Sequence, residues 1–212
     1  MNMKVLHVAE TIKGGVASVL NQLISSQNEI EICCILPDSQ ADEIYNNKKI
    51  LLKQFQRSGR NIKSLLALAN VFRVTLKEFK PDIIHLHSSF AGVICRFLLF
   101  FMPLDKKIKV IYCPHAFSFL MNVSSFKKYV YSFIERLLSL NTDAIICTSK
   151  YERNMAIQYG LKKDKLFVVY NGIQEPIVNI DDDMNPFDSH KINILYVGRF
   201  DYQKGIDILF DI

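Results

Sequence analysis

The stretch KVLHVAETIKGGVASVLNQLISSQNEIEICCIL, residues 4–36, decides the fold, because it reads as one strand–helix–strand unit. It opens with an apolar run, Lys4–Ala9, that predicts a buried strand. A Gly-Gly pair then marks a turn, and Val16–Ser26 has the apolar spacing of a helix. A second apolar run, Glu29–Leu36, predicts the next strand. Two nearly continuous apolar strands joined through a helix indicate a parallel sheet that is covered on both faces.

The same alternation of strands and helices continues along the chain. The further predicted strands are Asp82–His87, Lys109–Cys113, Ala144–Thr148 and Leu166–Tyr170, with one more expected around Ile50–Phe55. The further predicted helices are Asn61–Phe79, Phe90–Phe101, Ser125–Leu140 and Ser149–Tyr159, the last with a capping box from Ser149 to Glu152 and a stop at Gly160. The sequence therefore predicts an α/β fold, a Rossmann-like parallel sheet with helices on both faces.

Composition narrows the class of protein. The chain has 212 residues, of which 50% are hydrophobic, enough for one full core and part of another. The longest apolar run, Phe97–Leu104, is far short of the roughly 20 residues that span a bilayer, and the first residues read as a strand rather than a signal peptide. Five cysteines without a C-x-x-C spacing stand in apolar segments, which indicates buried, reduced thiols in a cytoplasmic protein.

The net charge of +5 is unevenly distributed. Between Lys48 and Lys80 there are nine Lys or Arg residues and one acid, Glu78, a surplus of eight positive charges. Either a solvated helix face or contact with an anionic membrane surface explains this surplus, whereas no motif for binding nucleic acid accompanies it. The aromatic and basic residues of Phe117–Phe133 have the same two interpretations, an ordinary helix or an interface with a lipid acceptor.

The alternation ends after residue 172. Residues 173–190 contain two prolines, five acids and no Lys or Arg, so they are predicted to form an exposed linker between domain 1–172 and the beginning of a second domain at 191–212. The linker includes three consecutive aspartates, 181–183, and hence a D-x-D pattern. We expect no metal there, because the run stands away from any strand end and a hard cation needs several converging oxygens.

The segment GRFDYQKG, residues 198–205, follows an apolar run, Ile192–Val197, that predicts a strand. After it, Gly205–Phe210 reads as the start of a helix. The exposed amides of a helix N-terminus attract anions, an arginine adds a bidentate fork for phosphate oxygens, and a lysine adds a point charge. Arg199 and Lys204 are therefore expected to bind a diphosphate.

Gly198-Arg199-Phe200 followed by Lys204-Gly205 resembles the G-R-[FL]-x-x-x-K-G segment of retaining, nucleotide-sugar-dependent glycosyltransferases with the two-domain GT-B fold, the group 1 or family 4 type. The resemblance implies that Arg199 and Lys204 grip the diphosphate of the sugar donor at the opening of the donor-binding domain. It covers the N-terminal domain and the start of the C-terminal one. The family's later acidic motif, two glutamates eight residues apart, has no counterpart in this sequence.

Other residues of the expected site come from the ends of predicted strands. Gly14 and Gly15 resemble the family's glycine-rich loop, which lies near the donor phosphates and the acceptor, with a plain turn as the alternative. His115, delivered to the sheet edge after a proline, resembles the family's active-site histidine, with packing or capping as the alternative. His87 and Ser88 end another predicted strand and are expected to line the same cleft.

His85 shares one face of its strand with His87, because side chains alternate with period two. An H-x-H pair can bind zinc, but no third ligand follows at a telling spacing, so no metal is expected. We expect His85 to be a hydrogen-bonded structural histidine. The site therefore has no cofactor or metal in this hypothesis, and the nucleotide-diphosphate sugar is a substrate.

The resemblance implies transfer of a sugar, with retention, to a glycan or lipid-linked acceptor in cell-surface polysaccharide biosynthesis. In such enzymes the leaving phosphate takes the acceptor proton, and no enzyme nucleophile is needed. One alternative is a non-catalytic acceptor-binding half that works with a separate donor-domain chain, or an inactive remnant. A dinucleotide-dependent oxidoreductase is disfavoured, since the glycine loop is not G-x-G-x-x-G.

Overall fold

The computed structural model describes residues 2–44, 50–102, 108–173, 187, 190–198, 200 and 205–210. The chain divides into two compact units, Met1–Ile173 and Gln174–Ile212. This division falls beside the end of the predicted first domain at residue 172. The assignment of 173–190 as a linker and of 191–212 as the start of a donor domain stays a prediction.

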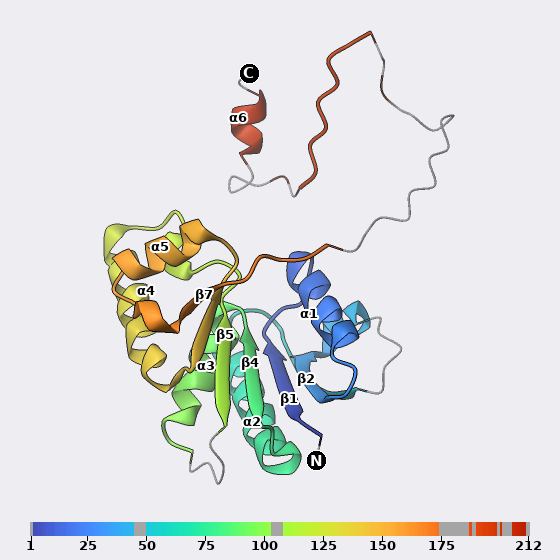
Figure 1. Ribbon diagram of the computed structural model, residues 1–212, viewed down its shortest axis with the longest axis vertical. Coiled ribbons are helices and arrows are strands. Elements are labelled where there is room, and N and C mark those ends of the chain that lie inside the picture. Colours follow the sequence, from blue (N-terminus) through green and yellow to red (C-terminus); the bar gives the residue numbers. More distant parts are fainter. Residues whose placement is uncertain are drawn as a thin grey trace. The chain divides into compact units, whose positions relative to one another are not determined.

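A seven-stranded, all-parallel sheet forms the centre of the first unit, in the order β3-β2-β1-β4-β5-β6-β7 (Figure 1). Its strands are β1 (Lys4–Ala9), β2 (Glu31–Pro37), β3 (Leu51–Phe55), β4 (Ile83–His87), β5 (Lys109–Cys113), β6 (Ala144–Cys147) and β7 (Leu166–Val168). The predicted parallel α/β fold is confirmed, and the extra strand expected around residues 50–55 is present as β3.

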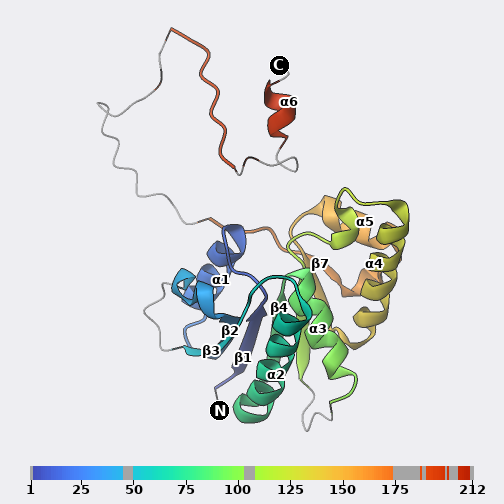
Figure 2. The same ribbon diagram turned by 180° about the vertical axis from the view of Figure 1, so that it is seen from behind.

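Helices cover both faces of the sheet (Figures 1 and 2). The α-helices of this unit are α1 (Gly15–Ser26), α2 (Ile62–Phe79), α3 (Ser89–Leu99), α4 (Ser125–Leu138) and α5 (Lys150–Gln158), with short 3-10 segments at Asp38–Glu43, Ser118–Leu120, Ser139–Asn141 and Lys163–Lys165. On one face, α1 buries Leu20 and Ile24 against alternate side chains of β2. On the other, α2 and α3 bury an apolar cluster that includes Phe72 and Cys95.

Helix ends follow from local hydrogen bonding. Asn61 caps α2, since its side chain accepts from the Ser64 amide at 2.9 Å. At α5 the predicted capping box is half correct, because the Ser149 hydroxyl accepts from the Glu152 amide at 3.0 Å. The Glu152 carboxylate, however, accepts from the amide of Thr148 at 2.7 Å, one residue before the cap. Gly160, with φ of 90°, lies just beyond α5 as expected.

A buried ionic network joins α3, α4 and β5. The Arg96 side chain is fully buried and donates to Glu135 Oε2 at 2.7 Å, while the Tyr112 hydroxyl donates to Glu135 Oε1 at 2.9 Å. The Arg96 guanidinium also lies 3.8 Å from the Tyr112 ring centroid. Gly92 is required beneath that ring, since a Cβ there would come within 2.3 Å of it. Pairing with Glu135 offsets the cost of burying the Arg96 charge, although Nη1 of Arg96 is buried without a hydrogen-bond partner among the described residues.

The cysteines and the helices agree with the compositional analysis. All five cysteines, at 33, 34, 95, 113 and 147, are buried and free of disulfides. Among the described residues, no helix combines the length and the apolar character needed to cross a membrane.

The second unit contains one helix among its described residues, α6 (Ile206–Phe210), which confirms the helix start predicted after Gly205. The strand predicted at Ile192–Val197 is wrong, since these residues form no strand. A strand exists only when its backbone pairs with another, and every strand in the described part of the chain belongs to the first unit. The aspartates 181–183 lie outside the described residues.

Candidate functional site

The strand order reverses between β1 and β4, because β2 and β3 extend the sheet on one side and β5 to β7 on the other. In open parallel sheets, ligands bind outside the carboxyl ends of the strands at such a reversal. Gly14 and Gly15 follow β1, His87 and Ser88 close β4, and His115 follows β5. The fold therefore brings these five predicted residues to one edge of the sheet.

The glycine loop presents open backbone at the start of α1. Gly14 precedes the helix with φ of 63° and ψ of −129°, a conformation that favours glycine. Among the described residues, nothing lies within 4 Å of a Cβ built on Gly14 or on Gly15. No side chain caps the first turn, so its amides remain suited to an anion.

Strained backbone gathers where β4 and β5 end. Ser88, His115 and Ala116 all have positive φ, of 76°, 54° and 139°. The amide of Ser88 donates to the carbonyl of Cys113 at 3.1 Å, which ties the two strand exits together. The Ser88 hydroxyl is buried and has no hydrogen-bond partner among the described residues. Such strain and unmet bonding are typical of functional sites.

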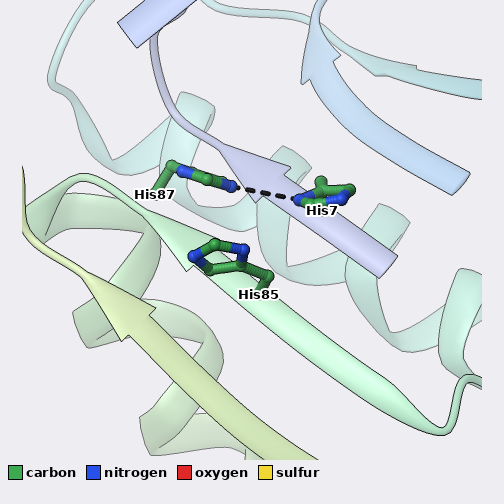
Figure 3. Close-up of side chains that lie close together, drawn as sticks. All are labelled: His7, His85 and His87. Carbon is green, nitrogen blue, oxygen red and sulfur yellow. Dashed lines mark hydrogen bonds between the residues drawn. The ribbon is translucent and has the colours of Figure 1, made fainter. Parts of the chain in front are cut away.

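Three histidines, His7, His87 and His115, form a hydrogen-bonded chain beneath this edge, and Figure 3 shows its contact between His7 and His87. Nδ1 of His7 lies 3.1 Å from Nε2 of His87, and Nδ1 of His87 lies 3.1 Å from Nε2 of His115. At the far end, Nε2 of His7 lies 3.4 Å from Oε1 of Gln27, the residue that ends α1. The chain therefore runs from the end of α1, across β1 and β4, to the loop after β5.

His85 lies beside this chain without joining it. It pairs with His7 in the β1–β4 register, and its ring centroid lies 4.1 Å from that of His87. The expected hydrogen-bonded role is wrong for its Nε2, which is buried and has no hydrogen-bond partner in the described part of the chain. His7, His85 and His87 offer nitrogens that all lie within 4.8 Å of one another, so a third potential ligand exists that spacing alone did not reveal.

Burial keeps all four imidazoles neutral. Desolvation lowers the pKa of His7 to about 4 and that of His115 to about 4. The pKa values of His85 and His87 are lowered well below the usual range, by desolvation first and then by the neighbouring histidines. A neutral imidazole has one N–H donor and one acceptor nitrogen, so near pH 7 each ring can donate once and accept once.

Part of the basic surplus is neutralised at the same edge. Glu10, which follows β1 and is buried, accepts from Nη2 of Arg57 at 2.7 Å and lies 3.8 Å from Nε of Arg60. Lys53 pairs with Glu78 at 2.8 Å. Glu10 therefore offsets part of the surplus in the folded chain, whereas Glu78 was already subtracted in the count.

The structure adds residues that sequence reasoning missed. His7 and Gln27 were not predicted. The available signal for His7 was that, once β1 and β4 pair, its side chain lies on the same face of the sheet as those of His85 and His87. Gln27 had no signal, since its contact depends on where α1 ends. Arg199 and Lys204 lie outside the residues that the structure describes, so their diphosphate role stays a prediction.

Comparison with known proteins identifies the class that this fold and sheet edge represent. Residues 14–175 match Glycosyltransferase Family 4, and the chain belongs to that family. An uncharacterized 41.2 kDa protein in the cps region of Klebsiella pneumoniae is 50% identical over 99% of this chain and 59% of its own length. The O-antigen biosynthesis glycosyltransferase WbnH of Escherichia coli is 32% identical over 66% of this chain and 38% of its own length.

The fold agrees with this membership. The Anabaena protein Alr3699/HepE, solved in complex with UDP and glucose, matches with a TM-score of 0.56 at 17% identity, over 81% of this chain and 45% of that one. The chain therefore spans from 38% to 59% of the length of these three proteins, and its fold is one Rossmann-like half of a GT-B structure.

Proposed function

We propose that this chain is the acceptor-side half of a retaining glycosyltransferase, together with the start of its donor-binding domain. The observation that carries the proposal is the convergence of the open glycine loop and His115 at the strand-order reversal, in a chain of Glycosyltransferase Family 4. The donor is a nucleotide-diphosphate sugar, in keeping with the UDP and glucose bound by the Anabaena neighbour. The acceptor is a glycan or a lipid-linked glycan of cell-surface polysaccharide biosynthesis, in keeping with the O-antigen role named for WbnH.

In this mechanism the cations and amides stabilise the charge that develops on the departing diphosphate. Arg199 and Lys204 supply the cations, and the first-turn amides of α1, behind Gly14 and Gly15, are a second group of donors suited to phosphate. The acceptor hydroxyl attacks the anomeric carbon on the face from which the nucleoside diphosphate leaves. A phosphate oxygen takes the hydroxyl proton, so the bond forms with retention and without an enzyme nucleophile.

His115 orients the reacting sugar or acceptor by hydrogen bonding. Its ring is neutral near pH 7, because burial lowers its pKa to about 4, so it acts as a hydrogen-bonding group rather than as a cation. His87 holds the ring of His115 from behind, at 3.1 Å. Ser88 offers a hydroxyl at the same strand end.

In this proposal the enzyme works at the inner face of the cell membrane as a peripheral protein.

We expect the 212-residue chain alone to transfer no sugar. Positioning of the donor supplies several kcal/mol of a catalysed barrier, and residues 192–197, where the donor-binding domain is proposed to start, form no strand that could help to position it. The rival is a half that binds the acceptor and works only with a separate donor-domain chain. Incubating the purified chain with a panel of nucleotide sugars and a membrane extract tests this expectation. Robust turnover by the chain alone would contradict it.

The decisive experiment joins this chain to the part of the K. pneumoniae relative that it does not match, since the match covers 59% of that protein's length. In the joined protein, Arg199→Ala and Lys204→Ala should each lower turnover roughly 100-fold, as removal of a transition-state contact does. Lys162→Ala, at an exposed position after α5, is the matched control. Near-normal turnover in either variant would contradict the diphosphate-binding role of that residue.

In the same joined protein, His115→Ala should lower turnover while nucleotide binding persists.

A further inference from the structure

We propose that Gln27 and His7 are positioning residues that, through His87, fix the tautomer of His115, with the proton on Nε2 and Nδ1 left as an acceptor. Neither residue belongs to the site expected from the family resemblance. The statement about the tautomer stands by itself, whereas its use in sugar transfer rests on the proposed function.

The polarity of the chain starts at Gln27. The atom of Gln27 that faces His7 is the carbonyl oxygen Oε1, which can only accept. Nε2 of His7 must therefore carry the proton and donate across the 3.4 Å contact. Since a neutral imidazole has a single N–H, Nδ1 of His7 is then an acceptor.

The same rule passes the polarity along the chain. Because Nδ1 of His7 accepts, Nε2 of His87 must donate across 3.1 Å, and Nδ1 of His87 becomes an acceptor. Nε2 of His115 must then donate to it across the last 3.1 Å. The remaining nitrogen of His115, Nδ1, is thereby left without a proton.

Burial makes this arrangement strict. His7 and His87 are fully buried, and desolvation lowers the pKa of each, so an additional proton that would remove the polarity is disfavoured. Reversing one ring alone would place two donors or two lone pairs face to face within a dry site, at a cost comparable to a lost buried hydrogen bond. The three rings therefore reverse together or not at all.

A metal ion on His7, His85 and His87 would use the same atoms in another way. A metal held by Nδ1 of His7 and Nε2 of His87, the two nitrogens that lie 3.1 Å apart, would replace the hydrogen bond between them and break the chain at its middle. The two arrangements exclude each other, so metal binding becomes a result that the experiment can report.

The chemical consequence lies at His115. With Nδ1 as an acceptor, the ring receives a hydrogen bond from a hydroxyl of the sugar or acceptor. In the reversed tautomer it would offer an N–H and repel that hydroxyl's proton. Gln27, at the end of α1, thus determines whether the half-buried ring of His115 accepts or donates.

The test is 15N NMR of the histidine rings in the 212-residue chain, labelled only at histidine. Two-bond 1H–15N correlations distinguish protonated from unprotonated ring nitrogens. At neutral pH we expect His115 to show a protonated Nε2 and an unprotonated Nδ1, with the same pattern in His7 and His87. A protonated Nδ1 on His115, or loss of the hydrogen-bonded pattern when one equivalent of Zn²⁺ is added, overturns the proposal.

Two variants of half-buried Gln27 impose opposite polarity. Gln27→Glu offers only acceptors and should retain the wild-type tautomer of His115. Gln27→Lys offers only donors and should move the His115 proton from Nε2 to Nδ1. His85→Phe, which replaces a buried imidazole outside the hydrogen-bonded chain by a phenyl ring, is the control that should leave the tautomer unchanged. The proposal is wrong if the Glu and Lys variants show the same His115 tautomer.

Kinetics of the joined protein then connect the tautomer to sugar transfer. Gln27→Lys should lower kcat roughly 3- to 10-fold, the value of one hydrogen bond, while KM for the donor stays unchanged and Gln27→Glu retains activity. A tautomer that switches in the spectra without a change in kcat would refute the use of His115 in transfer and leave the positioning chain intact. A spectrum that does not respond to Gln27→Lys would refute the positioning chain whatever the kinetics show.

Discussion

Two apolar segments, β2 and Ile192–Val197, differ in structure although both are predicted to be strands. β2 contains Leu36, which is fully buried, whereas Leu195, within Ile192–Val197, is 71% exposed. Both segments predict a strand from sequence, and only β2 forms one. β2 pairs in register with β1 and β3 and packs beneath α1, while Ile192–Val197 pairs with no strand in the described part of the chain.

This difference shows that an apolar sequence is compatible with a β-strand, but that the strand forms only where the segment pairs with other strands. A backbone paired on both sides satisfies its N–H and C=O groups, and burial of its side chains adds about 25 cal/mol for each Å² of apolar surface. A segment that pairs with no strand does not gain the hydrogen bonds of a sheet. Substitutions in a paired strand and in a segment that pairs with no strand should therefore differ in their effect on stability.

The largest effect should come from breaking the buried network. Glu135→Ala leaves the guanidinium of Arg96 and the hydroxyl of Tyr112 buried without their shared partner, and should lower the free energy of unfolding by about 3–5 kcal/mol. Glu31→Ala removes an exposed ion pair with Lys4, at 3.0 Å, and should cost less than about 1 kcal/mol. Urea unfolding followed by circular dichroism measures both. Equal costs would show that burial does not decide the value of these pairs.

The same substitution in the two compared segments should have unequal effects. Leu36→Ala removes a fully buried side chain and should cost about 2–5 kcal/mol, from lost transfer free energy and the cavity it leaves. Leu195→Ala, at 71% exposure, should change the stability of the first unit by less than about 0.5 kcal/mol. Thermal and urea unfolding of both variants provides the measurement. A large loss from Leu195→Ala would mean that the second segment has neighbours after all.

Acid should weaken the first unit through its buried histidines. Above pH 6.5 His7 is neutral in both states, but between pH 6.5 and about 4 the unfolded chain takes up a proton that the folded chain refuses. The free energy of unfolding should therefore fall across this window, by on the order of 3 kcal/mol from His7 alone at 1.36 kcal/mol per pKa unit.

Urea titrations at several pH values measure this loss, and His7→Phe should flatten it. The comparison with this variant matters because burial raises the pKa of Glu152, which acts in the opposite direction in this window. A wild-type curve as flat as that of His7→Phe would contradict the neutral, buried state of His7.

Sequence reasoning identified the sheet and most of its helices, because period and apolar runs are local signals. It also placed Gly14, His87, Ser88 and His115 at one edge, since parallel strands all end on the same side. It missed the chain from Gln27 to His115 because that chain depends on register: His7 meets His87 only when Ala9 pairs with His87. It wrongly predicted a strand at Ile192–Val197, because the sequence of a segment does not specify whether another strand is available to pair with it.

The smallest expected effect concerns apolar residues that are exposed on a well-formed helix. The outer side of α4 carries a stripe at helical spacing, flanked by Lys127 and Lys128: Phe126, Tyr129, Phe133 and Leu137, with exposed fractions of 76%, 63%, 52% and 48%. Unlike Ile192–Val197, this stripe stands on a packed scaffold, so it can present its side chains together. We expect weak, reversible binding to anionic vesicles, with up to about 1 kcal/mol from each basic residue and a strong dependence on salt.

Sedimentation with neutral and with anionic vesicles, at low and at high salt, measures this binding. The double variant Lys127→Glu, Lys128→Glu should abolish the preference for anionic lipid. The matched control is Lys63→Glu, Lys77→Glu, which reverses two exposed cations on α2 and should have a smaller effect, since Lys127 and Lys128 lie beside the apolar stripe. Equal recovery with both lipids, or none with either, would leave α4 an ordinary solvated helix, and exposed apolar residues would then be inert in both parts of the chain.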